Sequence, residues 1–228
     1  MVQNVRVSSV NRATTIQSLS VSFTVGLYGI AFGAAGIASG FSLLQTCLIS
    51  LLTFSGASQF ALVGVIGAGG SAISAISTAS LLGIRNALYG LRMSPILEAT
   101  GLKKLVAAQL TIDESTGVAI GQEQLGKKVM QQGFWQTGFG VYFFWNIFTL
   151  VGALSANAMN DPAAWGLDAA VPAAFLGLVW PRLTNQRERI LATSSAVASL
   201  ALVPFVRPGV PIIATALLAV IFGWKARS

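Results

Sequence analysis

The chain has 228 residues, of which 54% are hydrophobic and 9% are charged, against roughly 25% charged residues in an ordinary soluble domain. This composition argues against a water-soluble fold and predicts an all-α, polytopic bundle of transmembrane helices. The formal net charge of +7 suits cytoplasmic loops that face anionic lipid, whereas the scatter of the basic residues over short loops disfavours nucleic-acid binding.

The N-terminal third of the chain is the most apolar part. No charged residue occurs between Arg12 and Arg85, a stretch that would make on the order of 100 Å of helix at about 1.5 Å per residue. It must fold back into about three spans to fit a hydrocarbon slab roughly 30 Å thick. The apolar segment from Ile16 to Ser39 is longer than the roughly 7–15 residues of a signal-peptide core, so we interpret it as the first span.

Hydropathy, together with the positions of Gly, Pro and charged residues, predicts one membrane domain over residues 1–228 with about seven spans: 16–38, 43–66, 71–91, 134–154, 166–181, 190–206 and 208–224. Residues 92–133 are the one long polar insertion. We expect this insertion to be a cytoplasmic aqueous loop with an amphipathic helix from Gly101 to Ile112.

Lys and Arg are concentrated in three segments, which places these segments in the cytoplasm: the insertion, the loop around Arg187 and the tail around Lys225. With seven spans, the N-terminus then lies outside, although it carries Arg6 and Arg12. An even number of spans, with one early segment broken or re-entrant, is the alternative.

Glycine recurs at spacings of three and four residues in the first span, which puts the glycines on one helix face. A face without side chains lets another backbone approach closely, as in small-xxx-small packing. We interpret it as a packing seam, although a seam against a moving helix or a partner subunit would have the same pattern. Its members are Gly26, Gly29, Gly33, Gly36 and Gly40.

The second span carries small polar residues and a glutamine in its middle: Ser55, Gly56, Ser58 and Gln59. Gln59 needs partners inside the bundle, and the Ser-Gly pair can loosen the helix so that backbone groups turn toward a cavity, as in the discontinuous helices of transporters. Because Ser and Gly are also common at helix contacts in membranes, packing is the alternative to a substrate or gating role.

The third span has a polar face that includes Arg85, about six residues before the end of the span. Arg85 either extends to the cytoplasmic surface or lies with Asn86 in a water-filled vestibule, where its guanidinium would hold a carboxylate through two hydrogen bonds. In the fourth span Asn146 shares a face with Tyr142 and Thr149 and is a third candidate for substrate binding or gating.

Two carboxylates are candidates for proton coupling. Asp168 opens the fifth span, where it would alternatively be an N-terminal helix cap, and Asp113 lies in the polar insertion. Histidine is absent and Cys47 is the one cysteine, so a Ser–His dyad and a His or Cys metal site are excluded. We therefore expect no enzyme, no metal and no cofactor.

Four phrases in chain order resemble the AzlC family: Phe54-Ser-Gly-Ala-Ser-Gln-Phe60, Arg85-Asn-Ala-Leu-Tyr-Gly-Leu91, Leu110-Thr-Ile-Asp-Glu-Ser115 and Gly166-Leu-Asp-Ala-Ala-Val-Pro-Ala-Ala-Phe175. The resemblance implies a large subunit of a two-component exporter in the bacterial cytoplasmic (inner) membrane, with a small AzlD-type membrane subunit as partner. It also implies export of leucine, isoleucine, valine and often methionine, driven by the proton motive force.

An amino acid zwitterion suits the polar residues identified here. Arg85 or a helix terminus would hold its carboxylate, side-chain oxygens would hold its ammonium, and aromatic residues would line the rest of the site. The aromatic candidates are Phe54, Phe60, Phe143 and Phe144. The alternatives are a channel or carrier for another small solute, and a structural membrane subunit without a substrate site.

Overall fold

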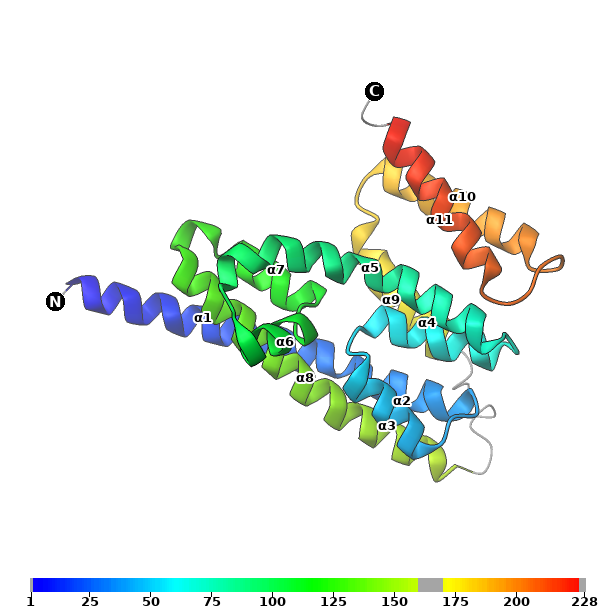
Figure 1. Cartoon of the computed structure of the whole chain (residues 1–228), viewed down its shortest axis with the longest axis horizontal. Coiled ribbons are helices and arrows are strands. Elements are labelled where there is room, and N and C mark those ends of the chain that lie inside the picture. Colours follow the sequence, from blue (N-terminus) through cyan, green and yellow to red (C-terminus); the bar gives the residue numbers. More distant parts are fainter. Residues whose placement is uncertain (1, 160–169, 226–228) are drawn as a thin grey trace.

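The structure is a computed structural model that describes residues 2–159 and 170–225 (Figure 1). The fold is helical throughout this part of the chain. The predicted helical class is therefore confirmed. Two helical stretches of this part, Val10–Ala38 and Lys127–Asn157, are long and apolar enough to cross a membrane. The other predicted spans remain predictions.

The first predicted span comprises helices α1 (Val2–Gly26) and α2 (Tyr28–Ala38), which follow each other across a single turn residue. Both run alongside α8 (Lys127–Asn157), the longest helix, as Figure 1 shows. Glycine makes this close approach possible. A Cβ atom at Gly29 would lie 2.5 Å from the carbonyl oxygen of Trp145, and one at Gly26 or Gly33 would also overlap α8.

The expected glycine seam divides at its C-terminal end. Gly36 faces Thr46 rather than α8, and a Cβ there would lie 2.6 Å from the Thr46 methyl carbon. Gly40 differs from the expectation altogether. It lies in the turn after α2 with a φ of 86°, and there is open space where its Cβ would stand. Glycine suits this position because of the left-handed backbone, not because of packing.

The second predicted span is not one helix. It is divided into α3 (Leu43–Leu52) and α4 (Gly56–Gly67), with the break at residues 53–55. Helix α5 (Ala72–Leu97) then packs against α4, and it continues six residues beyond the predicted end of the third span before the left-handed residue Glu98 ends it. A broken second segment was one of the two possibilities that the charge distribution allowed.

The polar insertion contains more than the one helix that the sequence predicts. It forms α6 (Gly101–Gln109), α7 (Asp113–Gly121) and a short 3-10 helix η1 (Glu123–Leu125), and α7 packs against α8. Helix α6 ends three residues before the expected Ile112. The reason is local, since the Ser115 hydroxyl accepts a hydrogen bond from the Ile112 N–H and donates to the carbonyl of Leu110, which shapes a turn there.

The C-terminal part consists of α9 (Ala170–Val179), the 3-10 helix η4 (Trp180–Arg182), α10 (Gln186–Leu202) and α11 (Val210–Lys225). Helices α10 and α11 lie side by side, at the edge of the molecule in Figure 1. The turn between them is held to the start of α5, where the Ser74 hydroxyl donates a 2.6 Å hydrogen bond to the Pro208 carbonyl.

Candidate functional site

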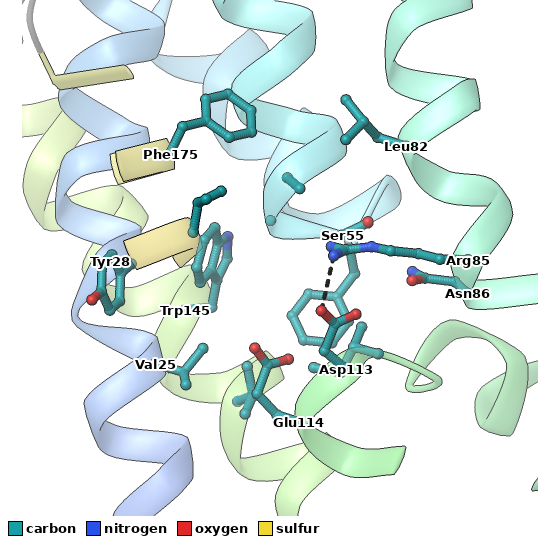
Figure 2. A pocket seen from close by; sticks show the side chains of 16 residues that line it. Val25, Tyr28, Ser55, Leu82, Arg85, Asn86, Asp113, Glu114, Trp145 and Phe175 are labelled. Atoms are coloured by element: carbon teal, nitrogen blue, oxygen red, sulfur yellow. Dashed lines mark hydrogen bonds and ion pairs between the residues drawn. The ribbon is translucent and has the colours of Figure 1, made fainter. Parts of the chain in front are cut away.

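A cavity of about 180 Å³ lies where the break between α3 and α4 meets α5, α7, α8 and α9. This volume is below the roughly 300–1,000 Å³ of pockets for drug-sized ligands, so the cavity suits a small solute. Figure 2 shows charged side chains at one end and Phe175 at the other. The lining includes Phe54, Ser55, Gly56, Arg85, Asn86, Asp113, Glu114, Trp145 and Phe175.

Arg85 and Asp113 form an ion pair in this cavity. Arg85 comes from the middle of α5 and Asp113 is the first residue of α7, and Arg85 Nη1 lies 2.9 Å from Asp113 Oδ2. Their side chains are 32% and 16% exposed, whereas the ion pair of Arg92 with Glu123 is 56% and 59% exposed. Arg85 therefore turns into the cavity instead of extending to the surface.

The Arg85 guanidinium keeps hydrogen-bonding capacity beyond this pair. Its Nε atom is buried, as is the Asn86 Oδ1 atom, and neither has a hydrogen-bond partner among the described residues. Both residues line the cavity. A planar guanidinium carries five N–H donors, so Arg85 can hold a second carboxylate while it contacts Asp113.

The N-terminus of α4 supplies a second positive feature. Ser55 precedes the helix in an extended conformation, and its hydroxyl donates to the Ser58 hydroxyl at 3.1 Å instead of capping a backbone N–H. Gly56 and Ala57, in the first turn, line the cavity. Because the first N–H groups of a helix have no partner within it and carry partial positive charge, this end attracts an anionic group.

Gln59 does not line the cavity. Its side chain is 1% exposed, and its Nε2 atom donates to the Ser50 carbonyl at 3.2 Å and, more weakly, to the Ile49 carbonyl at 3.4 Å. Its Oε1 atom accepts a 2.9 Å hydrogen bond from the Trp145 indole N–H. The glutamine that the sequence suggested for substrate binding thus holds the helix break together and connects it to α8.

Side chains from other helices also donate hydrogen bonds to the carbonyls at the C-terminal end of α3. The last four carbonyls of a helix have no partner within it, and in α3 these belong to Ile49, Ser50, Leu51 and Leu52. The Leu51 carbonyl accepts from the Tyr142 hydroxyl at 3.2 Å and from Gln109 Nε2 at 3.0 Å, and Gln109 also approaches the Leu52 carbonyl at 3.4 Å. Donors from α4, α6 and α8 therefore cap the end of α3.

Two further predicted site residues lie outside the cavity lining. Ser58 is buried behind the break, where it accepts from Ser55. Asn146 accepts from the Ser50 hydroxyl at 2.8 Å and donates to the Tyr142 carbonyl at 2.7 Å, which joins α3 to α8. Asp168 lies outside the described residues.

Of the aromatic candidates, Phe54 lines the cavity. Phe60 is buried next to it, Phe143 is 59% exposed, and Phe144 packs edge-on against Phe23. Glu114, Trp145 and Phe175 also line the cavity but were not among the predicted site residues, although Glu114 and Phe175 belong to the quoted phrases. Their position in those phrases was the available signal.

Comparison with known proteins gives a family and two named relatives. Residues 20–159, more than half of the chain, match the family described as AzlC protein. The inner membrane protein YgaZ of Escherichia coli is 27% identical over 182 residues, which cover 75% of this chain and 72% of that protein. An uncharacterized membrane protein of Archaeoglobus fulgidus is 28% identical over 177 residues, 73% of each chain. No solved structure matches.

Proposed function

Because the chain belongs to the AzlC family of membrane proteins, we propose that it is the large subunit of a secondary transporter. The proposed substrates are leucine, isoleucine and valine, with methionine as a further one, and the proposed direction is export from the cytoplasm. The subunit works with a small AzlD-type membrane subunit in the bacterial inner membrane, and the proton motive force drives it. The two relatives, both named as membrane proteins, support the membrane location.

The observation that carries the proposal is the Arg85–Asp113 pair beside the N-terminus of α4. An amino acid presents one carboxylate and one ammonium group close together. The remaining guanidinium donors of Arg85 and the first N–H groups of α4 suit the carboxylate, and Asp113 suits the ammonium. Phe54, Trp145 and Phe175 provide apolar walls for a branched side chain.

Proton coupling follows from competition at Asp113. The ionised carboxylate attracts the substrate ammonium, and a proton that binds to Asp113 removes this charge and so weakens the hold on the substrate. A proton that enters from outside releases the amino acid there, and loss of the proton to the cytoplasm restores the binding site. Protons therefore exchange for the amino acid, which is the exchange that an exporter driven by an inward proton gradient needs.

The test uses the chain together with its small subunit in proteoliposomes. Saturable exchange of labelled leucine supports a carrier, unsaturable flux supports a channel, and the absence of both supports a structural subunit. Asparagine lacks the charge that holds the substrate ammonium and cannot take up a proton. We therefore expect Asp113→Asn to exchange leucine with a weaker affinity and to lose the acceleration by a pH gradient. Glu123→Gln, which breaks the exposed ion pair with Arg92, is the matched control and should respond like the parent. An Asp113→Asn variant that still follows the pH gradient contradicts the coupling scheme.

A second variant tests whether Arg85 binds the substrate carboxylate. Arg85→Lys replaces a planar, two-bond donor with a point charge. Loss of one charge-assisted hydrogen bond costs about 1.5–3 kcal/mol, or on the order of tenfold to a hundredfold in apparent leucine affinity. Half-saturation of exchange measures this change, with Arg92→Lys on the exposed face as the control. Equal leucine affinities in Arg85→Lys and the parent would show that Arg85 does not bind the substrate carboxylate.

A further inference from the structure

A second, larger cavity lies on the other side of Phe175. It has a volume of about 510 Å³, lies between α4, α9, α10 and α11, and is lined mainly by apolar residues such as Val65, Val206 and Pro208. Among the described residues, Phe175 alone lines both this cavity and the one that holds Arg85. Its ring is therefore the shared wall of the two cavities.

Phe175 is less confined than the aromatic residues around it. It meets Phe60 with ring centroids 6.1 Å apart, and Phe60 in turn contacts Phe32 and Trp145. Phe60 is fully buried and Trp145 is 5% exposed. Phe175 is half-buried and belongs to the ten-residue helix α9, so its side chain is the least confined of the cluster.

The two cavities approach opposite ends of the helices. The smaller one reaches the start of α7, in the insertion that the charge distribution places in the cytoplasm. The larger one reaches the α10–α11 turn and the end of α4. In the predicted topology one span separates each of these turns from a basic cytoplasmic segment, so both lie outside. Phe175 lines both cavities and lies at one end of the smaller one in Figure 2, so it stands between them.

We propose that Phe175 is the gate of the translocation pathway: its ring separates the polar cavity at Arg85 from the apolar outer cavity, and rotation of that side chain joins them. This proposal rests on the proposed transport function and adds the route and the residue that closes it. The apolar outer cavity then accepts the aliphatic side chain of the substrate as it leaves the charged site.

Side-specific labelling tests the gate without measuring transport. The parent is a Cys47→Ser chain with its small subunit in intact cells, and the probe is the membrane-impermeant anion 2-sulfonatoethyl methanethiosulfonate, added outside. Val206→Cys, in the outer cavity, should be labelled. Leu82→Cys, which lines the inner cavity, should be labelled slowly in the parent and at least tenfold faster when Phe175→Ala is added.

Leu176→Ala is the matched control because Leu176 is the next residue on α9 and is 58% exposed. It should leave the labelling of Leu82→Cys unchanged. Phe175→Trp, which enlarges the side chain, should slow both labelling and leucine exchange, and it serves if the alanine variant does not assemble. The gate is overturned if Leu82→Cys is labelled at the same rate with and without Phe175→Ala in an assembled protein. It is also overturned if Leu176→Ala accelerates this labelling as much as Phe175→Ala does, or if Val206→Cys does not react.

The two proposals fail separately in this design. If Phe175→Ala accelerates labelling in a protein that exchanges no leucine, the result supports the gate and contradicts the proposed substrate. If the protein exchanges leucine but Phe175→Ala does not change the labelling rate, the result supports the transport function and contradicts the gate.

Discussion

Gln59 is a buried amide whose contacts favour the packing alternative over direct substrate binding. The sequence requires partners for it inside the bundle, and the structure provides them, since the amide bonds to the Ser50 carbonyl and the Trp145 indole. Because its nitrogen donates one hydrogen bond and its oxygen accepts another, the Gln59 amide has little remaining capacity to bind a substrate. Its contribution to the site is indirect, because it keeps the break that exposes the N-terminus of α4 to the cavity.

We expect Gln59→Leu to destabilise the protein, because it leaves the Trp145 N–H and the Ser50 carbonyl without this partner. A buried polar group without a partner costs about 1–3 kcal/mol, and each kcal/mol lowers the melting temperature by about 2–4 °C in a chain of this size. Thermal unfolding in detergent measures the loss. Gln124→Leu on the exposed 3-10 helix is the control.

A double-mutant cycle sharpens this prediction. Trp145→Phe removes the indole N–H, so Gln59→Leu should cost less in that background than in the parent. Identical costs in both backgrounds would show that the hydrogen bond between Gln59 and Trp145 contributes no stability.

At the level of elements, α8 organises the fold because α1, α2, α3 and α7 all pack on it. The contact between α2 and α8 is backbone against backbone in two places. Gly33 lies against Thr149 and Ala153, and Gly152 lies against the Ile30 carbonyl. Between membrane helices, where lipid and side chains are equally apolar, such close approach is a main source of attraction.

Gly33→Ala tests this contact with the smallest possible side chain. Its Cβ would overlap the Thr149 carbonyl and stand 2.6 Å from the Ala153 nitrogen, so α2 and α8 must move apart. We expect a loss of at least about 1–3 kcal/mol, as for other overpacked contacts, seen as a lower melting temperature and less monodisperse protein in gel filtration. Gly90→Ala on α5 is the control, since its Cβ enters open space and alanine favours a helix by about 0.5–1 kcal/mol. Equal stability of the two variants would mean that α2 and α8 are not in close contact.

Over the whole molecule, large apolar side chains point outward from most helices. Ile73 is 78% exposed on α5, Phe143 is 59% exposed on α8 and Leu200 is 72% exposed on α10. Soluble monomers rarely expose such extensive apolar surface. This surface, together with the family, supports a bilayer around the bundle.

The orientation in that bilayer is open to a direct test. In a Cys47-free chain, Lys104→Cys on α6 should react with an impermeant thiol reagent only when the cytoplasmic side is accessible, because basic loops remain inside. Arg207→Cys, in the turn between α10 and α11, should react from outside in intact cells. The reverse pattern would invert the topology and, with it, the inner and outer assignment of the two cavities.

The sequence predicted the helical class, the family and the position of the first and fourth spans, because each depends on composition, local phrases or a long apolar run. Three of the predicted site residues, Arg85, Asn86 and Asp113, line one cavity, but the sequence did not pair Arg85 with Asp113. That pairing depends on how the insertion folds back between α5 and α8, which no local pattern specifies. Ser58, Gln59 and Asn146 were grouped with the site because sequence does not distinguish a polar group that binds a ligand from one that caps a neighbouring helix.

The capped end of α3 has a consequence for how the protein is made. Its last carbonyls depend on donors from Gln59, Gln109 and Tyr142, and Tyr142 follows Leu52 by about ninety residues. At roughly 5–20 residues per second, the ribosome needs about 5–20 s to add that length. During those seconds Gln59 and Gln109 are already available as donors, but the Leu51 carbonyl still lacks the Tyr142 hydroxyl. The end of α3 therefore acquires its full set of donors only with the fourth apolar segment, and a truncated nascent chain that stops before α8 should be a target for membrane quality control.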